Sequence, residues 1–324
     1  MRQRRVNRAV ELLIVCDFGA PLGASAQSKK TIVIEAARSG DGRYRIAPAG
    51  RNERLVRRCG SSRHWADNCR GWTIPSLARS LTADREVIVA SFDFPFSIPY
   101  SLLQNPTFAG RVSANAFCTR ANWIRFLETG VDLAFASERA DARLRLDPAL
   151  QSWKDKKFWA KRATDIATNA QPALKDKFQN LFNMTVIGSR FLEWLSSGGM
   201  QIVLSRREKG RAVERAVIET YPGAVAKAVG FEGNYKQKPE YCLEAAETYL
   251  LAQGITLDFD GEVRRFCLEY RTPPNDPDGA DAFLCLVTAI CFREGFSEWH
   301  QGHATPEQLD EEGCIVTPAK LAAS

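Results

Sequence analysis

Asp17, Asp93 and Glu219 each end a run of apolar and β-branched residues, a pattern typical of a buried β-strand. In open α/β sheets, ligands gather outside the carboxyl ends of the strands. Carboxylates at that edge are oxygen ligands that suit a divalent cation. The three acids are therefore candidates to share one site, although a single acid at a strand end often only caps a turn.

A further pair of acids begins a strongly predicted helix near the C-terminus. Asp276 can act as its N-cap and Pro277 as its first residue, and the residues that follow are almost wholly apolar. Asp278 and Asp281 are three residues apart and share one helical face, which continues into the expected core. Burying Asp281 without a partner would be costly, which favours a metal ion or a basic side chain beside it. The alternative is that both acids only complement the helix dipole.

Carboxylates that converge from distant segments suit hard cations such as Mg²⁺ or Mn²⁺. In a two-metal site the ions lie about 3.5–4 Å apart, one activating water and the other stabilising the leaving oxygen of a phosphodiester. The acids therefore predict hydrolysis of a nucleic-acid backbone.

The segments that would position these acids have an α/β pattern. Two domains are expected: a core of residues 10–99 and 183–318, and a mostly helical insertion at 100–182, after a basic tail at 1–9. We expect strands at 12–17, 31–36, 44–47, 86–93, 201–204, 212–219 and 314–316, and helices at 74–81, 191–196, 239–252, 261–270 and 276–292.

Charge is distributed unevenly along the 324 residues, although the net charge is only +6. The net charge is +10 over residues 1–80, +7 over 81–238 and −11 over 239–324. The basic segments can bind a polyanion such as DNA or RNA through its phosphates, and the acidic segment can hold a cation. The alternative is that these are solvated faces that happen to differ in charge.

Nine cysteines, an odd number without a CxxC pair, favour reduced thiols and a cytoplasmic protein. The longest nearly apolar stretch, residues 283–292, is too short to span a bilayer, so no membrane segment is expected. The Arg-rich N-terminus resembles a secretory signal, but its apolar run at 12–16 is shorter than the roughly 7–15 residues that such a signal needs. We therefore expect a strand there, which keeps Asp17 in the protein.

Four segments, at 15–21, 91–99, 217–222 and 278–282, resemble the predicted nucleases grouped as domain-of-unknown-function family 429. Weaker matches lie at 162–165, 184–188 and 312–318, so that the resemblance covers about residues 10–318. It implies a ribonuclease H-like fold, a mixed five-stranded sheet flanked by helices, with a helical insertion.

The acidic helix also resembles that of RuvC-type Holliday-junction resolvases, in which two Asp three residues apart begin the last helix. The resemblance implies that Asp17, Asp93 and Asp281 bind metal, with Asp278 or Glu219 as a fourth ligand. Family members often carry His before the first Asp of this helix, where this chain has Pro277.

The resemblance also implies that Lys236, which follows the Glu219 strand, is suited to bind a substrate phosphate. The adjacent Tyr235 is a second substrate-binding candidate. Arg162 and Lys157 are the other substrate-binding candidates, and both lie in a stretch rich in Trp and Lys at 153–162. That stretch can stack bases and hold phosphates, but it is equally consistent with an amphipathic helix packed on the core.

Other sites are weaker predictions. Cys59, His64 and Cys69 lack standard zinc spacing and a fourth ligand, and His300 and His303 read as a surface loop. No phosphate-binding loop of the P-loop or Rossmann type is present. The leading hypothesis is a metal-dependent nuclease acting on DNA or RNA. The alternative is a non-catalytic module of the same fold that binds nucleic acid, a nucleotide or a partner protein.

Overall fold

The computed structural model of the chain describes most of the expected core and part of the expected insertion. The described residues are 11–18, 31–38, 42–48, 72–113, 118–130, 161–173, 181–206, 214–259, 261–269 and 278–321. Four predicted features lie outside these ranges: Lys157, the segment 59–69 whose spacing does not fit a zinc site, Pro277 and the basic tail.

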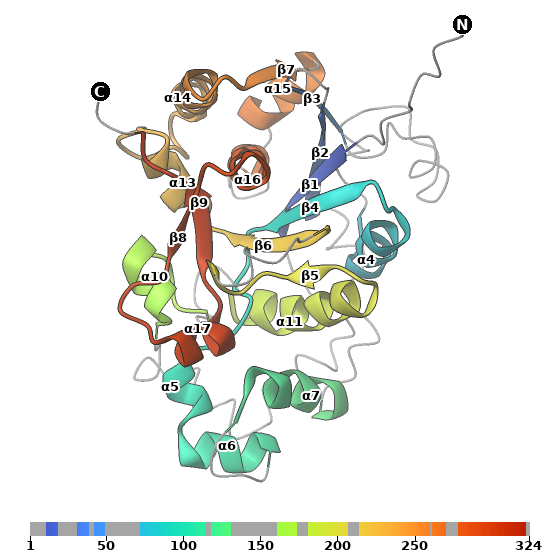
Figure 1. Cartoon of the computed structure of the whole chain (residues 1–324), viewed down its shortest axis with the longest axis vertical. Coiled ribbons are helices and arrows are strands. Elements are labelled where there is room, and N and C mark those ends of the chain that lie inside the picture. The colour runs from blue at the N-terminus through green and yellow to red at the C-terminus, as the bar shows by residue number, and fades with distance from the viewer. Residues whose placement is uncertain are drawn as a thin grey trace, which may run out of the picture.

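A mixed β-sheet runs through the molecule (Figure 1). Its first three strands, β1 (Glu11–Phe18), β2 (Thr31–Arg38) and β3 (Arg43–Pro48), form an antiparallel meander. On the other side of β1 come β4 (Val87–Phe92) and β6 (Ala216–Thr220), each parallel to its neighbour. These strands are rich in apolar and β-branched residues because helices cover both faces of the sheet.

Four more strands extend this sheet. They are β5 (Gln201–Ile202), β7 (Thr256–Phe259), β8 (Ser297–His300) and β9 (Ile315–Pro318). The order is β7-β3-β2-β1-β4-β6-β9-β8, with β5 paired to β6 off this path. The sheet thus has nine strands, whereas the residue pattern predicted seven and the family resemblance implied five. Strands β7 and β8 were not predicted, because these four-residue strands are only partly buried and lack an apolar run.

Each face of the sheet is covered by its own set of helices (Figure 1). On one face the long α16 (Asp278–Glu294) contacts β1 and β2, and α13 (Pro222–Ala228), α14 (Pro239–Ala252) and α15 (Gly261–Glu269) surround α16. The opposite face carries α4 (Ile74–Ala83) and α11 (Leu181–Ser197), which contact each other. The α/β class expected from the sequence is confirmed.

Successive residues of the central strands pack in different cores, as the two-residue period of a strand requires. Val15 and Val89 belong to the core with α16, whereas Cys16 and Phe92 belong to the core with α4 and α11. The seven described cysteines are all buried free thiols, as expected for reduced cysteines in apolar surroundings.

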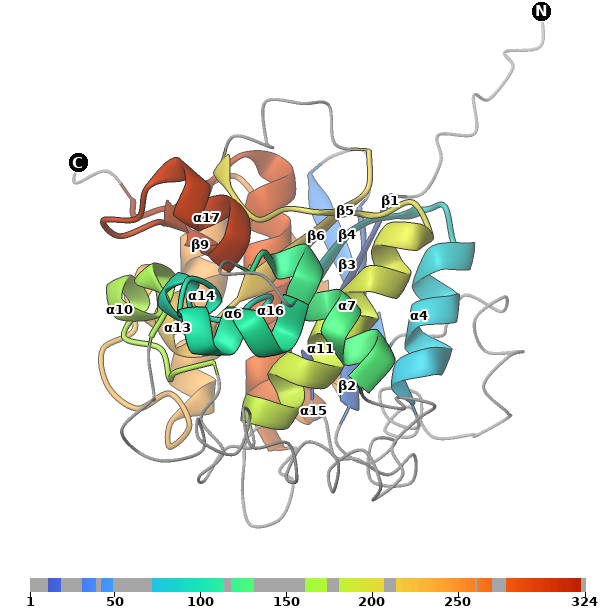
Figure 2. The same ribbon diagram turned by 90° about the horizontal axis from the view of Figure 1, so that it is seen from below.

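The described part of the expected insertion is helical. It contains α5 (Tyr100–Leu103), α6 (Pro106–Ser113), α7 (Arg120–Gly130) and α10 (Ala163–Thr168). In the view from below, α6 and α7 lie over α11 (Figure 2). Phe108 and Trp123 form a small separate core there, which reaches Val186 of α11. The division of the chain into two domains stays a prediction.

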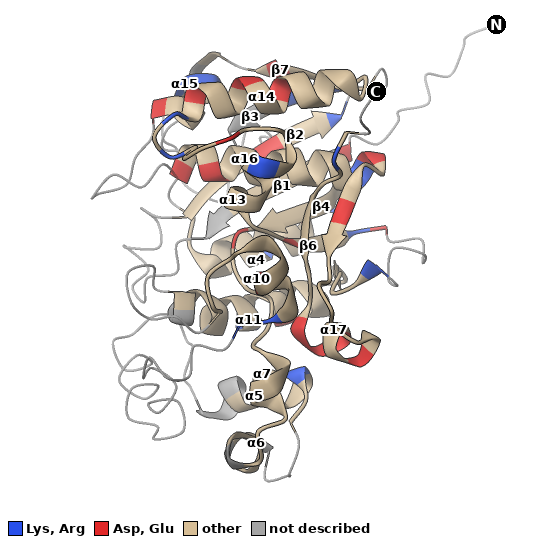
Figure 3. Cartoon of the chain, turned by 90° about the vertical axis from the view of Figure 1, so that its left-hand side faces the viewer, with Lys and Arg blue, Asp and Glu red and all other residues tan. Residues whose placement is uncertain are grey.

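Asp and Glu of the acidic C-terminal part of the sequence gather on α14 and on α17 (Pro306–Glu312) (Figure 3). None of the helices in the described ranges combines the length and apolar character that a membrane crossing requires.

Candidate functional site

The strand pairing brings the three strand-end acids to one edge of the sheet. The N–H of Asp93 donates to the carbonyl of Cys16 at 3.3 Å, so the backbones of Asp17 and Asp93 lie side by side. On the other side of β4, Phe92 pairs with Glu219. The side chain of Asp17 lies outside the described part of the structure, so its expected role as a metal ligand stays a prediction.

Strand alternation separates Glu219 from Asp93. Glu219 is in register with Phe92, whose ring packs on Phe191 of α11 with the centroids 5.1 Å apart. Thr220, the next residue of β6, hydrogen-bonds Ser91 over 2.6 Å, and Ser91 lies one position before Phe92. Because neighbouring residues of a strand point to opposite faces, Asp93 and Glu219 do not share a face.

Glu219 belongs to a buried group of charged residues that we call the arginine cluster, made of Arg162, Asp165, Glu219 and Glu312. Arg162 is 1% exposed, and its guanidinium donates to Glu219 at 2.5 and 2.8 Å and to Asp165 at 2.7 and 3.2 Å. The last N–H donates to the backbone carbonyl of Glu312 at 3.2 Å. All five guanidinium N–H groups therefore have acceptors within the protein.

The carboxylates of the arginine cluster also accept hydrogen bonds from the surrounding backbone. The N–H of Phe96 donates to Glu219 at 2.9 Å, and the N–H groups of Tyr100 and Ala163 donate to Glu312 at 2.5 and 2.9 Å. Burial raises the pKa of Glu219, against the opposing effect of Arg162. The cluster ties α10 to the ends of β6 and α17. In this structure Arg162 and Glu219 bind each other and the surrounding backbone, and their expected roles in substrate and metal binding stay predictions.

Asp281 forms a different group on the α16 face, which we call the Asp281 cluster: Asp281, Tyr235 and Lys236. Asp281 is 4% exposed. Its Oδ1 accepts a hydrogen bond from the Tyr235 hydroxyl at 2.5 Å, and its Oδ2 accepts one from the Lys236 ammonium at 3.2 Å. The prediction that a buried Asp281 needs a cation or a basic partner is confirmed, and in this structure the partner is Lys236.

Asp93 lies within electrostatic range of the Asp281 cluster. Burial raises the pKa of Tyr235 well above its usual value, and the charges of Asp281 and Asp93 raise it further. Burial also raises the pKa of Tyr221. The charges of Asp93 and Asp281 raise this pKa further, whereas the charge of Lys236 lowers it. The structure therefore brings together Asp93, Asp281, Tyr235 and Lys236, all of which the sequence singled out, and adds Tyr221.

The first turn of α16 is held close to α15. Gly279 stands between the two acids, and a Cβ at this position would lie 2.5 Å from the carbonyl oxygen of Phe266. Glycine permits this close backbone approach. Asp278, 6% exposed, is buried in the same turn, as the sequence predicted. Asp278 and Asp281 are thus placed by backbone packing as well as by helix periodicity.

The donor chemistry of this edge partly fits a divalent cation. Asp93 and Asp281 supply hard oxygen ligands, and Asp281 already faces a positive charge. Within the described ranges, however, no group of three His, Cys, Asp or Glu side chains is arranged to hold a metal ion. Asp17, whose side chain lies outside the described part of the structure, is the predicted further carboxylate.

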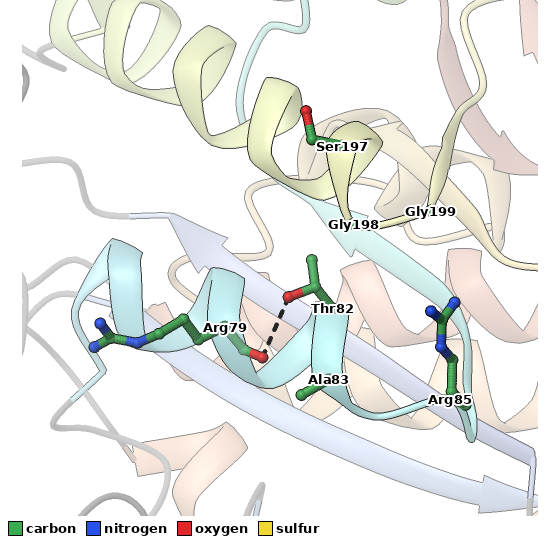
Figure 4. Close-up of a pocket in the computed structure, with 7 residues that line it drawn as sticks. All are labelled: Arg79, Thr82, Ala83, Arg85, Ser197, Gly198 and Gly199. Atoms are coloured by element: carbon green, nitrogen blue, oxygen red, sulfur yellow. Dashed lines mark hydrogen bonds between the residues drawn. The ribbon is translucent and has the colours of Figure 1, made fainter.

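Two surface pockets lie away from these acids. The larger, about 580 Å³, is at the amino end of β4, whereas Asp93 follows its carboxyl end (Figure 4). It is lined by Arg79, Thr82, Ala83, Arg85, Ser197, Gly198 and Gly199. The second, about 380 Å³, is lined by Lys227, Gly230, Phe231, Glu232 and Gly233. Neither pocket contains a residue that the sequence predicted for the site.

The structure also adds residues that sequence reasoning did not assign. In the sequence, Asp165 ends a weak motif at 162–165 and Glu312 begins another at 312–318, and neither residue was assigned to the site. Tyr221 lies within the motif at 217–222 but was given no role. His300 ends strand β8 and hydrogen-bonds Thr317 at 2.7 Å, so the expected surface loop is wrong for His300, whereas His303 is exposed in a turn as expected.

No protein-family model matches this chain, and searches of curated proteins and of solved structures found no significant match.

Proposed function

We propose that this chain is a metal-dependent nuclease of the ribonuclease H-like class, which hydrolyses phosphodiester bonds of DNA or RNA by a two-metal carboxylate mechanism. The observation that carries the proposal is the position of Asp281. Its buried carboxylate pairs with a lysine at the end of the sheet where β4 and β6 finish, and the charge of Asp93 acts on the same tyrosine, Tyr235, as that of Asp281. This is the edge at which α/β sheets bind ligands.

The order of the elements supports the same class. The chain runs from the β1–β3 meander through α4 and β4 to β6, and ends with the acidic α16 and β9. This is the order that the resemblance to ribonuclease H-like nucleases implies. We include in the proposal that the chain is related to the domain-of-unknown-function family 429 and to RuvC-type resolvases.

Each residue has a proposed role. Asp93 and Asp281, with Asp17 and Asp278, hold Mg²⁺ or Mn²⁺, which when bound activates water and neutralises charge on the phosphate. Tyr235 holds the Asp281 carboxylate in place. Lys236 contacts a substrate phosphate, for which a flexible ammonium is suited. Lys157 stays a proposed phosphate contact outside the described residues.

The test compares cleavage of single-stranded, branched and hybrid oligonucleotides in Mg²⁺ or Mn²⁺. Asp93→Asn and Asp281→Asn are expected to abolish cleavage, because an amide binds a hard cation far more weakly than a carboxylate. Asp258→Asn, on exposed β7, is the matched control and is expected to cleave like wild type. Unchanged cleavage by Asp281→Asn would contradict the proposal.

One observation favours a non-catalytic module instead. Both oxygens of Asp281 have protein donors, and the described residues lack a three-ligand metal group. Such a module binds nucleic acid, a nucleotide or a partner protein without hydrolysis. If wild type cleaves none of the substrates but binds an oligonucleotide in a salt-sensitive manner, the non-catalytic alternative replaces the nuclease.

A further inference from the structure

We propose that Lys236 is an exchangeable counter-ion of Asp281: its ammonium neutralises Oδ2 in the metal-free protein, and a divalent cation displaces it towards a substrate phosphate. The inference rests on the proposed function, because it assumes that Asp281 binds the cation. It adds a coupling between metal binding and substrate binding, carried by one side chain.

The first step is that Asp281 requires a positive charge. Its carboxylate is 4% exposed and lies near the start of a helix whose buried residues, apart from Asp278 and Thr288, are apolar. An ionised carboxylate in such a place is costly unless it is paired. Tyr235 satisfies Oδ1 by a neutral hydrogen bond, so the compensating charge falls to the group on Oδ2.

The second step is that Lys236 is suited to leave. Its side chain is 37% exposed and approaches Asp281 at 3.2 Å through one ammonium on a long flexible stem. Lys236 belongs to a short turn rather than to a helix or strand, and its backbone N–H donates to the side chain of Asn234. A partly exposed ammonium can be hydrated again when it moves outwards, so breaking the ion pair has a small cost.

The third step concerns Tyr235, which acts as a positioning residue. Its hydroxyl lies 2.5 Å from Oδ1 and donates a hydrogen bond to it. The carboxylate therefore keeps its orientation while the group on Oδ2 changes.

A divalent cation at Oδ2 and the ammonium at its present position exclude each other, because both compete for one oxygen and repel one another. Displacement leaves an uncompensated ammonium at the same edge of the sheet, where a phosphodiester oxygen is a suitable partner. Metal and polyanion binding then strengthen each other, and this coupling is reciprocal.

The test uses calorimetric titration of the full chain with Mn²⁺. Lys236→Met removes the competing ammonium, and we expect it to bind Mn²⁺ more tightly by on the order of tenfold, within the range usual for coupled sites. Lys236→Gln, which keeps a polar side chain, is expected to change affinity in the same direction. Lys238→Met is the matched control, because Lys238 lies two residues away over the ring of Tyr241 and does not face Asp281.

A second measurement follows binding of a labelled single-stranded oligonucleotide, with Ca²⁺ in place of Mn²⁺ to prevent turnover. In wild type and in Lys238→Met, the metal is expected to strengthen oligonucleotide binding. In both Lys236 variants we expect this gain to be lost, because no ammonium is released.

The outcomes separate this inference from the proposed function. If wild type and Lys236→Met bind Mn²⁺ equally while Asp281→Asn does not bind it, the exchange is overturned and the metal site stands. If neither wild type nor the Lys236 variants bind Mn²⁺, or Asp281→Asn binds it normally, the metal site itself is overturned and the exchange falls with it.

Discussion

Two groups of acids lie at the same edge of the sheet, and each is held by one basic side chain. In the arginine cluster, Arg162 is 1% exposed and uses all five of its N–H groups within the protein. In the Asp281 cluster, Lys236 is 37% exposed and meets Asp281 at 3.2 Å. The first group is closed to solvent, whereas the cation of the second is partly exposed.

The difference follows from the chemistry of the two cations. A guanidinium is a planar fork that can bind two carboxylates bidentately, and it is suited to a buried ion pair. An ammonium is a compact, strongly hydrated charge on a flexible stem. The arginine cluster is therefore suited to stabilising the fold. The Asp281 cluster, at the same edge of the sheet, is suited to binding a ligand.

The largest expected effect comes from removing the cation of the arginine cluster. Arg162→Met leaves Asp165 and Glu219 buried without their partner, and breaking a buried pair in this way costs about 3–5 kcal/mol. We expect the free energy of unfolding in urea to fall by that amount.

Arg265→Met is the control, since its 71% exposed side chain lies 4.0 Å from Glu269, and its effect is expected to stay within about 0.5 kcal/mol. Adding Asp165→Asn and Glu219→Gln to Arg162→Met is expected to restore part of the stability. A loss below about 1 kcal/mol in the single Arg162 variant would contradict the structural role of the cluster.

A smaller effect is expected where α16 approaches α15. In Gly279→Ala, the added methyl group meets the backbone carbonyl of Phe266, which cannot move aside as a side chain can. Overpacking of this kind costs about 1–3 kcal/mol, measured as a lower urea midpoint.

Gly110→Ala in α6 is the matched control, because a Cβ there meets no atom within 4 Å and alanine favours a helix. We expect this variant to be neutral or up to about 1 kcal/mol more stable. Equal effects of the two substitutions would mean that contact with α15 does not fix the start of α16.

Much of the fold could be predicted from local pattern. The buried strands β1, β2 and β4 are apolar, β-branched runs, and α16 is marked by Pro277 and the acids that precede its apolar stretch. The strands that the sequence missed, β7 and β8, are stabilised by pairing with β3 and β9 rather than by their own composition. Tertiary pairing of this kind leaves no local signal.

The candidate site was predictable in part. Asp93, Asp281, Tyr235 and Lys236 were singled out from strand ends, helix spacing and motifs, and the structure brings them together. The separate position of Glu219 was not foreseen, because it depends on the register between β4 and β6. Sequence shows that an acid ends a strand, but not towards which face of the sheet it points.

In contrast to Arg162→Met, Asp281→Asn is expected to change the free energy of unfolding by less than about 1 kcal/mol. The amide oxygen can still accept the Tyr235 hydrogen bond, and Lys236 is exposed enough to be hydrated. Urea unfolding checks this, with Arg162→Met as the reference. A loss of 3 kcal/mol or more, on the scale of a broken buried ion pair, would make the Asp281 cluster as structural as the arginine cluster.

The smallest expected effect is a change in the pKa of Tyr235. Its pKa in the folded chain is raised by burial and by the charge of Asp281, so the folded state binds the phenolic proton more tightly than the unfolded state. The resulting stabilisation is fully present below about pH 10, the pKa of an unperturbed tyrosine, and is lost as the pH rises through the folded value. In Asp281→Asn the charge is gone, and we expect tyrosine to form phenolate at lower pH than in wild type, measured by near-ultraviolet absorbance. This shift is expected to vanish when Tyr235→Phe and Tyr221→Phe are both added, because Asp281 also raises the pKa of Tyr221. The pKa of Tyr44 is raised by burial and by Glu294, so Tyr44 is expected to titrate alike in both proteins. A shift that persists without Tyr235 and Tyr221 would mean that Asp281 acts on the fold as a whole.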